Sequence, residues 1–262
     1  MMKSKCSSFG LRTLATLSSL LAILVTWLGL SSGSVMARDE EPQFTTEFRL
    51  EDCVFQARGT NPYFILEPGY HLVLEGEEDG ETIRVVISVL PETERIFLPD
   101  RGLVKTRVVE ERESVDGELV EVSRNFFAIC DKTNDVFYLG EAVDIFNPDG
   151  TISHEGSWRA GEPDDDGLAE PGIIMPATFL LGSRYFQERA DGVALDRAEH
   201  VEMGLEVTTE AGTFDQCVKV RETTPLEPGA ESEKIYCPGV GLVVDDVVEL
   251  VEFGFNIIED DD

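Results

Sequence analysis

The sequence contains few of the residues from which catalytic and metal sites are most often built. It has three histidines in 262 residues, and it contains neither a Cys-x-x-Cys pair nor a His-Glu-x-x-His motif. His154-Glu155 begins the latter spacing, but Trp158 occupies the position of its second histidine. After residue 37 there is also no Gly-x-Ser-x-Gly elbow and no glycine-rich phosphate loop. The zinc, dithiol, serine-nucleophile and nucleotide sites with these signatures are therefore not expected, and no catalytic residue is assigned.

Positive charge is scarce as well. The chain has 21 Lys and Arg residues against 52 Asp and Glu residues, which gives a formal net charge of −31. Such a surface repels phosphate backbones and anionic lipids, so neither a nucleic acid nor a membrane surface is expected as a partner. Solubility is the simplest interpretation of this acidity, and attraction of cations or basic partners is the alternative.

The beginning of the chain predicts export. A basic start is followed by an apolar core, densest over residues 20–30, and by a small-residue stretch over 31–37. This order is typical of a signal peptide spanning residues 1–37 and cleaved between Ala37 and Arg38. A retained anchor helix is the alternative, although a bilayer span needs about 20 mostly apolar residues. The predicted location is periplasmic or extracellular.

The remaining chain is long enough for one large domain. Removal of the leader takes away three basic and no acidic residues, which leaves 18 basic and 52 acidic residues and a formal charge of −34. Residues 38–43 are predicted to form a disordered acidic tail, 44–258 a single all-β domain and 259–262 a second acidic tail. The stretch 159–172 is rich in Gly, Pro and Asp and predicts a long exposed loop that divides the domain into two halves.

Four cysteines follow the leader: Cys53, Cys130, Cys217 and Cys237. In a symmetric antiparallel hairpin, the numbers of any two residues that face each other add up to the same value. Arg221 and Glu233, which would form a pair of opposite charges, have the same sum as Cys217 and Cys237. We therefore expect a Cys217–Cys237 disulfide, and a Cys53–Cys130 disulfide by elimination. Four buried, unpaired thiols are the alternative.

Strand and turn signals dominate the rest of the sequence. Alternating runs at Tyr70–Leu74 and Thr82–Leu90 surround a turn, and Pro91 is expected to end the second strand. Asp116-Gly117 joins residues 103–113 to 118–129 in a second predicted hairpin.

A third hairpin is predicted around Asn147–Gly150, between Val136–Phe146 and Thr151–Trp158. No segment has a convincing helical period, although Glu188–His200 could hold one short helix. The predicted fold is all-β: an antiparallel β-sandwich or a strongly curved partial β-barrel with little helix.

Two groups of residues are weak candidates for a metal site. His200 and Glu202 would share the polar face of a strand and could share a cation, but zinc sites normally need three or four ligands. Asp164, Asp165 and Asp166 offer oxygens to Ca²⁺ but lack the ligand order of a calcium loop. A solvated strand face and a solvated loop are the simpler interpretations, so no cofactor is expected, with Ca²⁺ as the alternative.

The sequence near the C-terminus resembles a known pattern. Ala211–Val220 followed by Tyr236–Val243 is similar to the "AGTF…C.KV" and "Y.APGVGLV" segments of uncharacterised exported bacterial all-β proteins. Cys237 stands where those proteins commonly have Ala. The resemblance covers about residues 205–252 and implies a bacterial envelope or secreted location, without implying an activity.

These observations favour a secreted, non-enzymatic β-protein that binds an unidentified ligand or protein partner. An extracellular hydrolase and a Ca²⁺-dependent structural or adhesion module are the alternatives. Ten aromatic residues are candidates either for a cavity lining or for an ordinary core: Phe55, Tyr63, Phe64, Phe126, Phe127, Phe137, Tyr138, Phe179, Tyr185 and Phe186.

Overall fold

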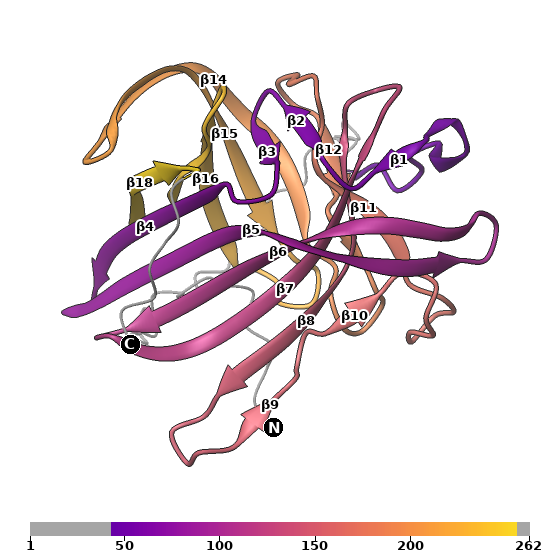
Figure 1. Cartoon of the computed structure of the whole chain (residues 1–262), viewed down its shortest axis with the longest axis horizontal. Helices are drawn as coiled ribbons and strands as arrows, with labels where there is room; N and C mark the ends of the chain where they lie inside the picture. The colour runs from indigo at the N-terminus through magenta and orange to yellow at the C-terminus, as the bar shows by residue number, and fades with distance from the viewer. Residues whose placement is uncertain (1–42, 256–262) are drawn as a thin grey trace, which may run out of the picture.

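The computed structural model describes residues 43–255 and shows an antiparallel all-β protein (Figure 1). The predicted signal peptide, its cleavage site at Ala37 and Arg38, the predicted tail 38–43 except for its last residue, and the tail 259–262 lie outside the described residues. Within 43–255 the one helix is the short 3₁₀ turn η1 (Leu50–Asp52), and no helix there is long and apolar enough to cross a membrane. The all-β prediction is confirmed.

The strands of the first half are β1 (Phe55–Gln56), β2 (Gly59–Asn61), β3 (Phe64–Leu66), β4 (His71–Glu78), β5 (Glu81–Leu98), β6 (Gly102–Val115), β7 (Glu118–Cys130), β8 (Val136–Phe146), β9 (Ile152–Ser153) and β10 (Trp158–Arg159). Those of the second half are β11 (Glu170–Met175), β12 (Arg184–Phe186), β13 (Glu188–Arg189), β14 (Arg197–Thr209), β15 (Gly212–Thr223), β16 (Glu231–Cys237), β17 (Gly241–Asp245) and β18 (Val248–Gly254).

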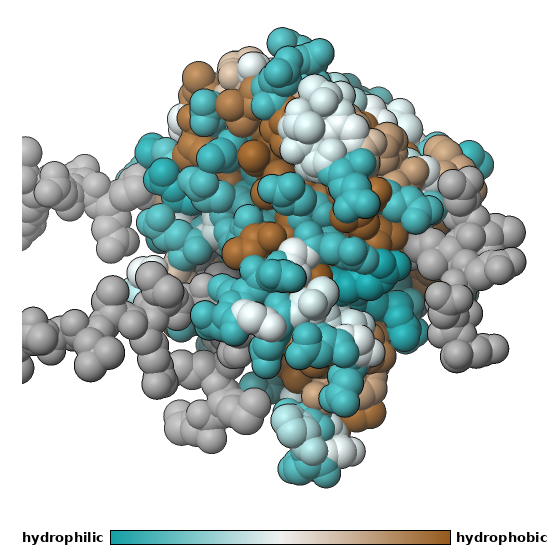
Figure 2. All heavy atoms as spheres, turned by 90° about the vertical axis from the view of Figure 1, so that its left-hand side faces the viewer, coloured by the Kyte–Doolittle hydropathy of each residue, from teal (hydrophilic) through white to brown (hydrophobic). Residues whose placement is uncertain are grey.

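One strongly curved sheet of 16 strands contains all but β2 and β3, in the order β12-β14-β15-β16-β17-β18-β4-β5-β6-β7-β8-β11-β13. In Figure 1 the strands β4–β8 cross the front of the molecule, and β14–β16 lie behind and above them. On the left-hand side of that view, the surface of the described residues is a mixture of hydrophilic residues and smaller hydrophobic patches (Figure 2). The ladder does not close within residues 43–255, but a single segment links its two ends. Residues 184–186 pair with β14, and residues 188–189 pair with β11. Gln187 lies between these two pairings.

The predicted hairpins form, except that the returning strand of the third is only Ile152–Ser153 instead of Thr151–Trp158, and their turns explain why. Asp79-Gly80 and Asp116-Gly117 all have positive φ, as the type I′ turn requires. At the third hairpin, Gly150 N donates to Asn147 O at 2.9 Å. These local turns fix the register of the long strands on either side of them.

Pro91 does not end its strand, so this prediction is wrong. Strand β5 continues to Leu98, with a register shift between Val89 and Thr93. Proline is tolerated at such a bulge because the ladder is already interrupted there. Arg107 Nη1 on β6 donates to the carbonyls of Leu90, Pro91 and Glu92 at 3.3, 2.7 and 3.1 Å.

Two further expectations need correction. The segment 188–200 holds β13, a turn and the start of β14 instead of a short helix. The predicted loop at 159–172 is shorter, because β10 ends at Arg159 and β11 begins at Glu170, and it is only partly exposed. Ala160 and Ala169 are buried, and β11 pairs with β8, so the sheet continues across the loop.

Both predicted disulfides are present. The Cα atoms are 5.0 Å apart for Cys53–Cys130 and 4.2 Å apart for Cys217–Cys237. Arg221 lies opposite Glu233, as the symmetric hairpin requires. Disulfides of this kind persist in oxidising environments.

Candidate ligand-binding cavity

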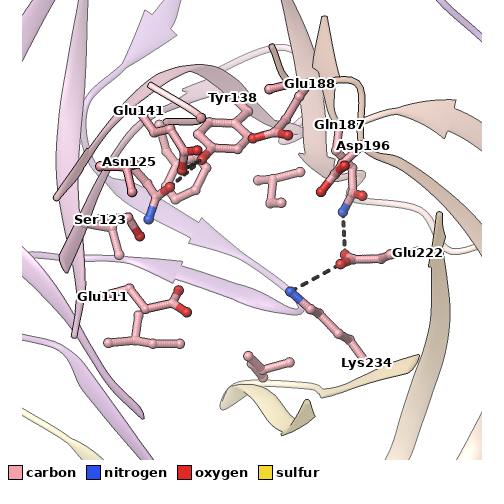
Figure 3. A pocket seen from close by; sticks show the side chains of 18 of the residues that line it. Glu111, Ser123, Asn125, Tyr138, Glu141, Gln187, Glu188, Asp196, Glu222 and Lys234 are labelled. Carbon is pink, nitrogen blue, oxygen red and sulfur yellow. Dashed lines mark hydrogen bonds and ion pairs between the residues drawn. The ribbon is translucent and has the colours of Figure 1, made fainter. Parts of the chain in front are cut away.

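The curved sheet surrounds a cavity of about 480 Å³, which is within the size range of small-molecule sites. Strands β4–β8 provide one wall and β15–β17 provide another. The segment from Gln187 to Asp196, which links the ends of the sheet, contributes as well. Figure 3 shows polar side chains from these separate elements pointing into one space.

Strand β7 shows how the lining is built. Its inward-facing residues are Glu121, Ser123, Asn125 and Phe127. Alternate residues of a strand face the same side, so this wall changes from acidic to aromatic over about 20 Å. The register places Ser123 opposite Glu111 on β6, and Asn125 opposite Glu141 on β8.

One part of the cavity is apolar. Its lining includes Phe64, Ile65, Tyr70, Leu72, Phe127, Val240 and Leu242. The rings of Phe64 and Phe127 meet edge to face at 5.2 Å. Tyr70 Oη donates to Val240 O at 2.7 Å, and burial raises the pKa of Tyr70 to about 12. Neutral rings and aliphatic side chains therefore form this part of the surface.

Tyr138 joins the apolar part to an acidic part. Its ring lies 4.7 Å from the ring of Phe127, and its hydroxyl is 2.7 Å from Glu141 Oε2 and also contacts Asn125 Oδ1. Burial raises the pKa of Glu141 to about 8, and the nearby Glu121 carboxylate adds to that increase against the opposing Tyr138 hydrogen bond. At neutral pH Glu141 is therefore mostly protonated.

Three more carboxyl groups of the lining are stabilised in the neutral form. Burial and then Asp196 raise the pKa of Glu188 well above its usual range, while Trp158 Nε1 donates to Glu188 Oε1 at 3.3 Å. Burial raises the pKa of Glu121 to about 7 and also raises that of Glu111. Among residues 43–255, Glu111, Glu121, Glu141 and Glu188 have no Lys, Arg or His within ion-pair distance.

Lys234 is the one basic side chain in the lining. Its ammonium lies 3.2 Å from Glu222 Oε2 and 3.4 Å from Asp245 Oδ2. Burial lowers the pKa of Lys234, but Asp245 and Glu222 outweigh it and hold the pKa well above its usual range. Lys234 is thus paired with Glu222 and with Asp245, whose pKa burial raises to about 7 against the opposing effect of Lys234.

Gln187 contacts the same group. Its Nε2 donates to Glu222 Oε1 at 2.6 Å, and its side chain lines the cavity. The residue is 3% exposed, and its Oε1 atom has no hydrogen-bond partner. A buried, unsatisfied acceptor is uncommon in proteins.

His200 and Glu202 do not share a polar face. His200 is buried, and its ring stacks on Phe179 at 3.8 Å, whereas Glu202 is exposed. A register shift between the two residues breaks the expected alternation. Burial lowers the pKa of His200 to about 4. His200 Nε2 lies 3.0 Å from Tyr185 Oη, so this histidine is a hydrogen-bonded core residue.

The Asp164–Asp166 stretch lies outside the cavity, and the Asp164 carboxylate stabilises the loop between β10 and β11. Asp164 accepts from the backbone N–H of Asp166 at 3.2 Å and of Asp191 at 3.0 Å. Within residues 43–255, no group of three or more His, Cys, Asp or Glu side chains is arranged to hold a metal ion.

Sequence reasoning missed the acidic residues of the cavity. Of the ten aromatic candidates, Phe64, Phe127 and Tyr138 line it, while others such as Phe137 are packed in the core. A useful signal was present in β7, where polar residues at 121, 123 and 125 continue the inward-facing alternation that ends at Phe127. The sequence has 52 acidic residues, however, and the curvature of the sheet decides which of them lie together in the cavity.

Comparison of the chain with protein-family models, curated proteins and solved structures finds no match. The geometry of the cavity is therefore the basis for assigning a function.

Proposed function

We propose that this is an exported, non-enzymatic binding protein that holds one small amphipathic organic molecule in its interior cavity. A single observation carries the proposal: a cavity of about 480 Å³ has an apolar lining at one part and polar groups at another. Ligand sites commonly combine apolar walls with a few polar groups that fix orientation. The signal-like leader and the two disulfides support export.

The proposal can be tested with the neutral fluorophore N-phenyl-1-naphthylamine. Its emission rises in apolar surroundings, and we expect saturable binding of one molecule per chain. Ser123→Phe places a large side chain in the cavity, because Ser123 is a buried lining residue. We expect this variant to weaken binding by about ten-fold or more, since overlap with the ligand is costly in a packed site.

Arg124→Phe is the matched control, because Arg124 is the next residue of β7 and is exposed on the opposite face. It should leave the dissociation constant within about two-fold of wild type. Equal binding by wild-type protein and a folded Ser123→Phe variant would place the probe elsewhere and overturn the proposal.

A further inference from the structure

One hydrogen-bonding group of the cavity lining is left without a partner. Gln187 Oε1 is buried without a donor, although the same side chain donates through Nε2 to Glu222. This contact fixes the amide orientation, because only the NH₂ group can donate to a carboxylate. The free oxygen therefore needs a donor, and the ligand is the natural source.

The charges lead to the same conclusion independently. Figure 3 shows Glu188 on the same side of the cavity as Gln187, and Glu141 on the other side of the Tyr138 ring. Neither Glu141 nor Glu188 has a cationic partner among residues 43–255. Lys234, the one basic lining residue, is already paired with Glu222 and Asp245. An anionic ligand would meet several carboxyl groups and no available cation, whereas a cationic ligand would meet carboxyl groups that lack a cationic partner and that can release their protons to become carboxylates.

We infer that the ligand is an organic cation: a protonated amine on an apolar body, with its ammonium held by Glu188 and Gln187 and with Glu141 as a more distant carboxyl group of the same cavity. This inference rests on the proposed function. A primary ammonium has three N–H donors and no acceptor, which complements a carboxylate and an amide oxygen. The apolar body would lie against Phe127 and the neighbouring aliphatic side chains, which are joined to the acidic part through the ring of Tyr138.

Binding should also exchange protons. The groups facing Glu141 are Glu121 on β7, Glu111 on β6, Tyr138 on β8, Glu188 on β13 and Asp196 before β14. Because the pKa of Glu141 is about 8, the empty cavity holds a proton there at neutral pH. A nearby ammonium lowers the pKa of Glu141, so binding should release protons into the buffer.

Three probes with one carbon skeleton separate the alternatives: 4-phenylbutylamine, 4-phenylbutanol and 4-phenylbutanoate. Each is titrated against the complex of the full protein with N-phenyl-1-naphthylamine, at about physiological ionic strength so that surface attraction is screened. We expect the amine to bind at least about ten-fold more tightly than the alcohol, because hydrogen bonds to charged groups are strong, and we expect the carboxylate to bind most weakly.

Substitutions then locate the ammonium. Glu188→Gln should reduce the ratio of amine affinity to alcohol affinity by about ten-fold. Glu141→Gln removes a more distant carboxyl group of the same cavity and should reduce the ratio by a smaller factor. Glu202→Gln makes the same charge change on an exposed residue outside the cavity and should leave the ratio unchanged. Both cavity variants remove a carboxyl group that burial disfavours in its charged form, so folding is expected to be preserved.

The outcomes distinguish the two proposals. Equal affinity for amine and alcohol, or tightest binding of the carboxylate, would overturn the cation assignment and leave the binding function intact. A preference for the amine that persists in both cavity variants would also overturn it, because the ammonium would then lie elsewhere. If neither the fluorophore nor any of the three probes binds, the binding function fails, and the cation assignment fails with it.

Discussion

Replacing Glu141 with Gln should change how the stability of the protein depends on pH. Burial raises the pKa of Glu141 from 4.5 to about 8, so the folded protein holds a proton that the unfolded chain releases. For a raised carboxyl pKa, the stabilisation is complete below the unfolded value and is lost as the pH rises through the folded value. The free energy of unfolding of the wild-type protein should therefore fall between about pH 4.5 and pH 8 because of this group.

The magnitude follows from the difference between the two pKa values, which is about 3.5. At about 1.4 kcal/mol for each pKa unit, the full loss is about 5 kcal/mol, of which about 3.5 kcal/mol falls between pH 5 and pH 8. Gln has almost the same size, stays neutral and retains an acceptor for the Tyr138 hydroxyl. As the pH rises from 5 to 8, the difference in unfolding free energy between Glu141→Gln and wild type should thus change by about 3.5 kcal/mol in favour of the variant.

The assay is urea unfolding followed by tryptophan fluorescence at several pH values, with the disulfides intact. Comparison of the two curves removes the contribution of carboxyl groups that do not interact with Glu141, whereas Glu121 and Glu188 interact with it and contribute to the difference. Glu118→Gln is the control, because Glu118 is exposed and the charge change is the same; its curve should run parallel to that of wild type. A Glu141→Gln curve that is also parallel to wild type from pH 5 to pH 8 would refute the burial argument.

Three further substitutions test the fold. Arg107→Lys should cost about 1–3 kcal/mol of unfolding free energy, because one amine cannot reproduce the guanidinium contacts to the β5 bulge; a loss below about 0.5 kcal/mol would show that the bulge does not need them. Gly172→Ala should cost about 1–3 kcal/mol and weaken fluorophore binding, because the new Cβ would lie 2.2 Å from Gln187 O; unchanged binding and stability would show that this close approach is relaxed in solution. Replacing Cys217 and Cys237 together by Ser should cost about 3 kcal/mol by the loop-entropy relation for a separation of 20 residues, and urea unfolding that matches wild type would contradict that value.

The sequence itself determined the local structure. Asp-Gly turns require positive φ and so fixed two of the hairpins, and the symmetric numbering of the 217–237 hairpin fixed its register and its disulfide. These features depend on residues close together in the chain, where backbone sterics and strand alternation act directly. The proline at 91 was misinterpreted because its compensation comes from Arg107 on the neighbouring strand.

Only the tertiary structure decided which acidic residues form the candidate site. Glu111, Glu141, Glu188 and Glu222 belong to four different strands, and no spacing in the sequence relates them. They meet because the sheet curves until the segment around Gln187 links its two ends. Curvature accumulates from the twist of many strands and from bulges, so it is a property of the assembled sheet rather than of any one segment. The same enclosure removes water from the carboxyl groups, and this loss of solvation raises the pKa values of Glu111, Glu141 and Glu188.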